Sequence, residues 1–210
     1  MVLETDLDRQ DRHQPGSLAG VARAPAKLAP VRWAVHGERT VYESDWVRLC
    51  LADVEVPGQG RFEHHVVRVP RKAAGAVVRD PARGVLLLWR HRFITDTWGW
   101  EIPAGRIEAG EEPIEAAERE AVEETGWRPL GLSPLVNYQP TNGLSDQRFH
   151  LFLSQSAEHV GEPTDPAEAE RLEWVSEERL YGIAKSGEMR DGLSLTAVLY
   201  ALAFGFLAGQ

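Results

Sequence analysis

The sequence has one cysteine, no long apolar run and no excess of positive charge, and each absence excludes a class of protein. Cys50 alone can form neither an internal disulfide nor a cysteine-based zinc site. No stretch is both long and apolar enough to span a bilayer, so no membrane partner is expected. The formal net charge of −9 argues against a nucleic-acid partner, because a general nucleic-acid binder carries a basic surface.

The N-terminal segment also lacks a signal. Its first residues, MVLETDLDRQDRHQPG, contain no apolar run behind a basic one, so the sequence predicts no secretory signal and a cytoplasmic protein. Residues 1–30 are polar and then rich in Ala, Pro and Gly without periodicity, which predicts a flexible tail. The 210 residues, 43% of them hydrophobic, suit one domain of ordinary size plus an appendage.

Hydrophobic patterns after this tail predict a β-hairpin first and then strands interspersed with helices. The hairpin covers residues 40–69, with its turn at residues 57–60. Further strands are expected at residues 74–78, 85–89, 98–102, 135–138, 148–153 and 172–175, and helices at 112–125, from Ser176 and at 194–207. This order predicts an α+β fold, a mixed β-sheet covered by helices, with an N-terminal antiparallel β extension over residues 31–70.

Residues 105–127 concentrate acidic charge. This stretch reads GRIEAGEEPIEAAEREAVEETGW and contains eight glutamates. Pro113 suits a first helical turn and Gly126 suits a helix end, so the residues between them are predicted to form one helix. On that helix Glu120 and Glu124 are four residues apart and share a face, with Glu123 beside them.

Charge pairing along the helix suggests a metal site. Glu115 and Glu123 each lie four residues from Arg119 and are expected to pair with it, which leaves Glu120 and Glu124 short of a cation. Several carboxylates on one rigid face suit a hard divalent ion such as Mg²⁺. The alternative is a solvated acidic helix face.

The acidic stretch resembles the Nudix box, a glycine followed after five residues by Glu and after seven more by Arg-Glu-hydrophobic-any-Glu-Glu-any-Gly-hydrophobic. The matching residues are Gly105, Glu111, Arg119, Glu120, Glu123, Glu124, Gly126 and Trp127. Ala121 departs from the pattern, since the family usually has a larger aliphatic residue there. The resemblance implies a Nudix hydrolase domain over residues 71–210, built as an α/β/α sandwich.

Around the box, residues 40–205 resemble the ADP-ribose pyrophosphatase branch of this family. The likeness includes WRHRF, WEIPAG and GEMRDGLSL and a three-stranded N-terminal extension. It implies a homodimer formed through that extension. It also implies hydrolysis of the diphosphate bond of a nucleoside diphosphate derivative, with ADP-ribose, giving AMP and ribose 5-phosphate, as the leading substrate.

The resemblance assigns roles to individual residues. It implies Mg²⁺, with Mn²⁺ as a substitute, held by the backbone carbonyl of Ala104 and by Glu120, Glu123 and Glu124. The residues implied in catalysis are Arg119, which orients the glutamates, Glu123, and Glu168 or its near alternative Glu170, which activates water. Arg92 is aligned with an arginine that contacts the diphosphate, and the other implied substrate residues are Arg68, Asn142 and Gly143.

The chemistry of diphosphate cleavage agrees with these residue types. A divalent ion lowers the pKa of bound water and neutralises phosphate oxygens, while a loop carboxylate can accept the proton. Asn142 replaces a proline of ADP-ribose-specific relatives, and Gln147 replaces a glutamate. Both departures leave other substrates open, including GDP-mannose, NADH, nucleoside triphosphates, coenzyme A and capped RNA. A regulator that binds ADP-ribose without hydrolysing it is a further alternative.

Overall fold

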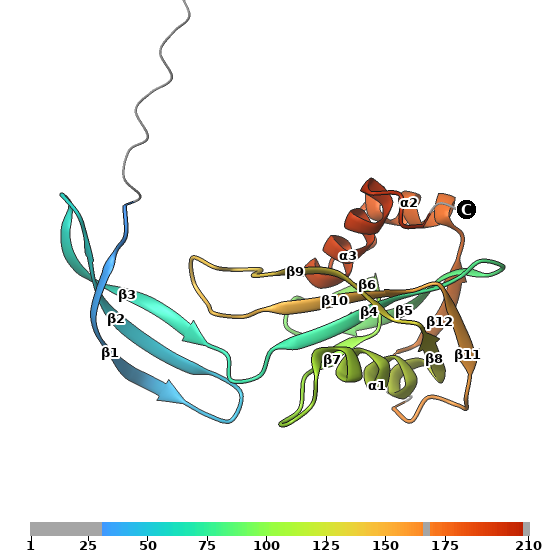
Figure 1. Cartoon of the computed structure of the whole chain (residues 1–210), viewed down its shortest axis with the longest axis horizontal. Coiled ribbons are helices and arrows are strands. Elements are labelled where there is room, and N and C mark those ends of the chain that lie inside the picture. Colours follow the sequence, from blue (N-terminus) through green and yellow to red (C-terminus); the bar gives the residue numbers. More distant parts are fainter. Residues whose placement is uncertain (1–30, 166–168, 208–210) are drawn as a thin grey trace, which may run out of the picture. The chain divides into compact units, whose positions relative to one another are not determined.

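The computed structural model describes residues 31–165 and 169–207, which form three β-sheets and three helices (Figure 1). The tail predicted at residues 1–30 lies outside this part of the chain. No helix among the described residues is long and apolar enough to cross a membrane.

The N-terminal extension is a three-stranded antiparallel sheet in the order β1-β2-β3, as predicted. Its strands are β1 (Ala34–Glu43), β2 (Arg48–Val56) and β3 (Gly60–Arg68). The hairpin pattern missed the break between β1 and β2, where the Ser44 hydroxyl accepts the N–H groups of Trp46 and Val47 and turns the chain. Every residue of β1 is exposed, because β1 is an edge strand.

The main sheet is mixed, as predicted, and has seven strands. The order β12-β5-β4-β10-β9 forms its path, with β6 paired to β5 and β7 to β4. β10 runs parallel to β4, and the other pairs are antiparallel. The strands are β4 (Ala73–Asp80), β5 (Gly84–Arg92), β6 (Thr97–Glu101), β7 (Ala104–Arg106), β9 (Ser133–Tyr138), β10 (Phe149–Ser154) and β12 (Arg171–Val175). The sequence patterns did not anticipate β7, or the two-stranded sheet of β8 (Trp127–Leu130) and β11 (Ser156–His159).

Helices cover both faces of the main sheet, which confirms the sandwich (Figure 1). α1 (Pro113–Thr125) packs on one face through three buried alanines, Ala116, Ala117 and Ala121. These meet the small residues Ala74 and Ala76 of β4, so the helix backbone can approach the sheet closely. Ala121, the departure from the Nudix pattern, is fully buried in this contact.

The other face of the main sheet carries α2 (Glu177–Ser186) and α3 (Gly192–Ala203). The Ser176 hydroxyl caps α2 by accepting the N–H of Arg179, as the helix start predicted there requires. α3 ends at Ala203, four residues before the predicted end, and Gly205 follows with a φ of 70°. The chain that leads into α3 lies beside β6, because the Trp100 N–H donates to the Glu188 carbonyl (2.9 Å).

Candidate active site

α1 carries most of the acidic residues, and local interactions fix both of its ends. Glu112 precedes the helix and donates its N–H to the Glu115 carboxylate (3.0 Å), while Pro113 occupies the first turn. Gly126 ends the helix with a φ of 73° and donates its N–H to the Val122 carbonyl (2.8 Å). The helix predicted from residues 112–125 is thus confirmed, with rigid ends.

Arg119 donates hydrogen bonds to three carboxylates of the box. Its Nε and Nη2 donate to Glu111 (2.9 and 3.0 Å), and its Nη1 donates to Glu120 and Glu123 (both 2.9 Å). Nη2 also donates to the Arg106 carbonyl (2.9 Å). These hydrogen bonds, above all those to Glu111, raise the pKa of Arg119, so its positive charge is permanent.

One of the two ion pairs predicted for Arg119, the pair with Glu115, is wrong. Glu123 pairs with it as predicted, but the Glu115 carboxylate is used at the helix start. Arg119 instead reaches back to Glu111, eight residues earlier, because the loop after β7 returns beside the helix. The expectation that Glu120 is short of a cation is also wrong, since Arg119 neutralises it.

Gly105 makes room for the Glu120 carboxylate. A Cβ atom on Gly105 would lie 2.1 Å from the carboxyl carbon of Glu120, well inside van der Waals contact. Only a residue without a side chain therefore allows Glu120 its observed position. Gly105, which begins the box, and Glu120 of the helix are thus in direct contact.

Glu124 was also expected to be short of a cation, and this prediction is wrong. Arg90, on β5, donates from Nη2 to Glu124 Oε1 (2.6 Å), and the second carboxylate oxygen accepts the Ala104 N–H (3.0 Å). The two charged side chains are 5% and 4% exposed. Because they are buried, each charge depends on the other for compensation.

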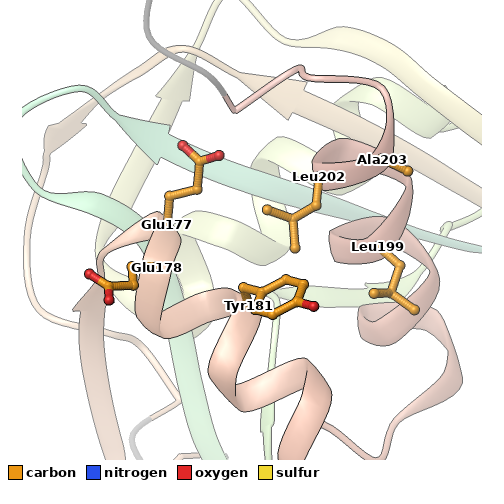
Figure 2. A pocket seen from close by; sticks show the side chains of 6 residues that line it. All are labelled: Glu177, Glu178, Tyr181, Leu199, Leu202 and Ala203. Atoms are coloured by element: carbon orange, nitrogen blue, oxygen red, sulfur yellow. The ribbon is translucent and has the colours of Figure 1, made fainter. Parts of the chain in front are cut away.

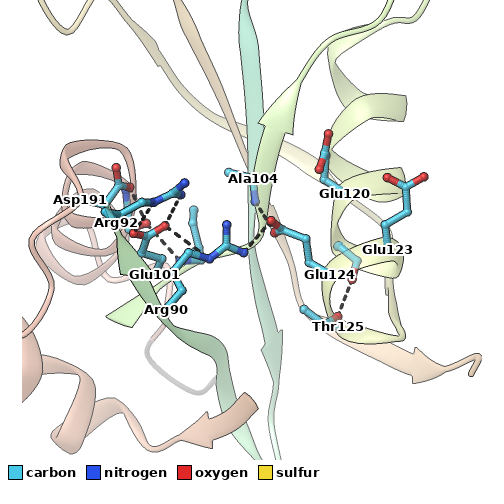
Figure 3. Close-up of polar contacts among 12 residues, drawn as sticks. Arg90, Arg92, Glu101, Ala104, Glu120, Glu123, Glu124, Thr125 and Asp191 are labelled. Carbon is cyan, nitrogen blue, oxygen red and sulfur yellow. Dashed lines mark hydrogen bonds and ion pairs between the residues drawn. The ribbon is translucent and has the colours of Figure 1, made fainter. Parts of the chain in front are cut away.

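Arg90 also connects the box to Arg92, as Figure 3 shows. Glu101 of β6 lies between the two arginines, with Arg90 Nε 3.8 Å from Oε2 and Arg92 Nη2 2.5 Å from the same atom. Arg92 Nε donates to the other carboxylate oxygen (2.9 Å), and this pairing raises the pKa of Arg92. A continuous series of ion pairs therefore runs from Arg92 to Glu124.

The three box carboxylates have the chemistry of metal ligands, although they do not converge on one point. Among the described residues, no three His, Cys, Asp or Glu side chains converge closely enough to hold an ion. The predicted donors, the Ala104 carbonyl and the three box carboxylates, are nonetheless all hard oxygens, which Mg²⁺ prefers. The bare Cα of Gly105 gives Glu120 its place in this set. The donor set fits a divalent cation, which must compete with Arg90 and Arg119 for the glutamates.

The loop after β11 approaches the end of α1. Thr164 and Asp165 donate their N–H groups to the Glu123 carbonyl (2.9 and 3.3 Å). Glu168 lies outside the described residues. Glu170 is exposed, and its N–H donates to the Trp89 carbonyl of β5 (2.9 Å). The loop is thus attached to the box helix on one side of Glu168 and to β5 on the other.

The remaining predicted substrate residues lie near β3. Arg68 pairs with Glu38 (2.5 Å), and the Gly143 carbonyl accepts a hydrogen bond from His64 (3.0 Å). Asn142 is exposed in the same loop between β9 and β10. In the described part of the chain, no hydrogen bond or ion pair joins these three residues to the box.

Three hollows in the surface bear on the search for the site. One, of about 420 Å³, is lined by Arg92, Glu101 and Arg190 among others, and so adjoins the ion-pair series. A wider one, of about 730 Å³, lies between α2 and α3 and is lined by Tyr181 and Leu199 (Figure 2). None of the predicted site residues lines this second hollow. Arg92 lines the first, and Arg119 and Glu123 line a third, of about 510 Å³, along α1.

Sequence reasoning missed Arg90 and Glu101. The signal that could have found Arg90 is its spacing: Arg90 and Arg92 are two apart on a strand and therefore share a face. Nothing local to Glu101 indicates that its side chain bridges them.

Comparison with known proteins decides the family. Residues 69–194 match the NUDIX domain, which is more than half of the chain. The chain belongs to the Nudix family. Nudix proteins generally use a divalent metal ion, and this Nudix hydrolase is a pyrophosphatase of nucleotide derivatives.

Its relatives act on different nucleotides. This Nudix hydrolase is 39% identical over 175 residues to the CMP-5'-(N-acetyl-N-hydroxy-3-aminopropyl)phosphonate hydrolase of Streptomyces rubellomurinus, covering 83% of this chain and 84% of the relative. It is 28% identical over 162 residues to the ADP-ribose pyrophosphatase of Bacillus subtilis, covering 76% and 87%. A crystal structure of an ADP compounds hydrolase has the same fold, with a TM-score of 0.71, 18% identity and coverage of 82% and 94%.

Proposed function

We propose that this protein hydrolyses, with Mg²⁺, the P–O–P bond that joins a nucleoside 5'-monophosphate to a second phosphorus group. The observation that carries the proposal is the arrangement of the box. Glu120 and Glu123 are held together by Arg119, and Glu124 is joined through Arg90 and Glu101 to the pocket beside Arg92. Oxygen ligands and a phosphate-binding cation thus belong to one connected set of side chains.

In this proposal Ala104, Glu120, Glu123 and Glu124 hold the ion. When bound, Mg²⁺ supplies positive charge for the phosphate oxygens and makes a bound water more acidic. Arg119 orients the carboxylates of Glu120 and Glu123 by donating a hydrogen bond to each. The protein residues thereby fix the charges in advance, which is how phosphoryl transfer is mainly catalysed.

Arg92 is proposed to bind the diphosphate. Glu101 holds its Nε and Nη2, so the guanidinium is oriented, while its side chain is 51% exposed and accessible to a ligand. The carboxylate that accepts the proton of the attacking water is proposed to come from the loop attached to the Glu123 carbonyl. Glu168 is the first choice there and Glu170 the second.

Two substrates are proposed within this class. The relative at 39% identity favours a CMP derivative of a phosphonate, whereas relatives at 28% favour ADP-ribose. We place the CMP-phosphonate first, since the higher identity extends over more of the chain. Asn142 and Gln147, which depart from the ADP-ribose pattern, agree with this order.

The test is a Mg²⁺-dependent hydrolysis screen with identified products. The panel contains CMP linked to 3-aminopropylphosphonate, ADP-ribose, GDP-mannose, UDP-glucose, NADH and deoxynucleoside triphosphates. We expect CMP and the free phosphonate as products, with ADP-ribose giving AMP and ribose 5-phosphate more slowly. Inactivity on every compound, with tight binding of one, would instead identify a binding protein.

We also propose that the protein is a homodimer through the N-terminal sheet. β1 is an edge strand whose ten residues are all exposed, including Val35, Val41 and Tyr42. Such an edge pairs readily with another chain. Light scattering should give the mass of a dimer for the full chain and of a monomer for Val35→Lys/Val41→Lys. Val160→Lys, an exposed valine elsewhere, is the control.

A further inference from the structure

The pocket beside Arg92, which we call the hairpin pocket, has walls from two distant parts of the chain. One wall is the turn between β5 and β6 with the adjoining β6 residues, and the other is the chain entering α3 at residues 190–192. Its volume is about 420 Å³. That volume lies within the range of small-molecule sites and suits part of a nucleotide derivative.

Gly99 lets the two walls meet. A Cβ atom on Gly99 would lie 3.1 Å from the Glu188 carbonyl oxygen and 3.6 Å from the Arg190 nitrogen. The neighbouring Trp100 N–H donates to the same Glu188 carbonyl (2.9 Å). The backbone that precedes α3 is therefore held firmly against β6, which fixes the position from which Arg190 projects.

The hairpin pocket has an arginine in each wall, Arg92 and Arg190, and a carboxylate near each, Glu101 and Asp191. Arg92 is committed to Glu101 through Nε and Nη2, and in the described part of the chain its Nη1 makes no hydrogen bond. Arg190 is exposed and forms no hydrogen bond or ion pair with any described residue. Asp191 instead caps α3, accepting hydrogen bonds from the N–H and hydroxyl of Ser194 (2.8 and 2.7 Å). Arginine donors directed to one site suit phosphate or phosphonate oxygens.

The pocket is poorly suited to a nucleobase. None of the described residues that line it is aromatic, so a base would find no ring on which to stack. Thr95 and Thr97 contribute hydroxyl groups, 2.7 Å apart, which can bond to polar substituents. The lining therefore fits the part of the substrate that lies beyond the nucleoside phosphate.

We propose that the hairpin pocket holds the phosphoryl or phosphonyl group distal to the nucleoside, and that Arg190 binds its oxygens together with Arg92. This inference rests on the proposed function and names the subsite for the second product. Arg190 then selects substrates with a charged distal phosphorus group and contributes nothing to binding of the nucleoside monophosphate.

The test compares Arg190→Gln with Arg190→Lys and with Lys185→Gln, which removes an exposed positive charge from α2. Calorimetry measures binding of ribose 5-phosphate, 3-aminopropylphosphonate, AMP and CMP to each full-length protein. We expect Arg190→Gln to weaken binding of the two distal probes about tenfold, because a hydrogen-bonded charge is lost. AMP and CMP should bind within twofold of the wild-type protein, Arg190→Lys should be intermediate, and Lys185→Gln should be unchanged.

Kinetics gives an independent measurement. With a substrate that is turned over, Arg190→Gln should raise KM about tenfold and change kcat less than twofold, since the contact is made equally in the ground and transition states. Equal loss of AMP and ribose 5-phosphate binding would overturn the proposal. So would wild-type affinity of Arg190→Gln for the distal probes, or a wild-type protein that binds neither of them. If binding follows the prediction but no diphosphate is hydrolysed, the subsite stands and the proposed function fails.

Discussion

Arg90 and Glu124 form a buried ion pair that joins the box helix to β5, with 2.6 Å between Nη2 and Oε1. The partners are 34 residues apart in the chain. Glu101 lies on the other side of Arg90, so this arginine lies between two buried carboxylates. The position of Glu124 therefore depends on the sheet as much as on its own helix.

Removing Arg90 should destabilise the fold strongly. Arg90→Met removes the buried cation that pairs with Glu124 and one of the two that lie beside Glu101, and we expect the free energy of unfolding to fall by about 3–5 kcal/mol. Urea denaturation in EDTA measures it. Arg39→Met, which breaks the exposed pair with Glu63, should cost less than about 1 kcal/mol. Equal losses in both variants would contradict a structural role for the buried pair.

Glu120→Gln should abolish most of the activity and leave the fold nearly intact. Loss of one metal-binding carboxylate costs several kcal/mol of transition-state stabilisation, so kcat should fall by about a hundredfold or more. Steady-state kinetics across Mg²⁺ concentrations is the measurement. Glu118 lies on the same helix, is half-exposed and occupies an unspecified position of the box, so Glu118→Gln should retain wild-type kcat. Similar rates for both variants would show that Glu120 is not a ligand.

Alanine substitution should lower activity at Gly105 and stability at Gly126. In Gly105→Ala the new Cβ displaces only the flexible end of Glu120, so kcat should fall more than tenfold while the free energy of unfolding changes by less than about 1 kcal/mol. Gly126→Ala places a Cβ 2.0 Å from the Gly161 carbonyl oxygen at a φ of 73°. It should cost about 2 kcal/mol or more. Thermal and urea unfolding beside kinetics would detect the contrast, and its reversal would refute this account.

Stability should depend on the ionisation of Glu111. Hydrogen bonds from Arg119, and then from the Glu108 N–H, hold the pKa of the Glu111 carboxyl below its usual 4.5. The unfolded chain therefore takes up this proton first as the pH falls, and the stabilisation is complete only above about pH 4.5. In EDTA at pH 7, Glu111→Gln should cost about 1–2 kcal/mol. The difference should shrink as the pH falls below 4.5; a constant difference would argue against the pairing.

The loop carboxylate should affect rate more than binding. For Glu168→Gln we expect a large fall in kcat with KM within about threefold, because the proton acceptor acts in the transition state. Glu170→Gln should be milder, since Glu170 is exposed and only its backbone is anchored to β5. If Glu170→Gln alone loses activity, the acceptor is two residues from the predicted position.

The sequence by itself determined the α+β sandwich and the common face of Glu120, Glu123 and Glu124. Both follow from local rules, because hydrophobic periods specify strands and helices and the 3.6-residue helical turn fixes which side chains are neighbours. The Gly126 helix end was predictable for the same reason.

Only the tertiary structure decided which cations the carboxylates meet. Arg90 reaches Glu124 because β5 and α1 pack together, and Glu101 reaches both Arg90 and Arg92 because β6 pairs with β5. The hairpin pocket likewise exists because the chain before α3 lies against Gly99. Charge pairing over such sequence separations depends on strand pairing and packing, which no local spacing encodes.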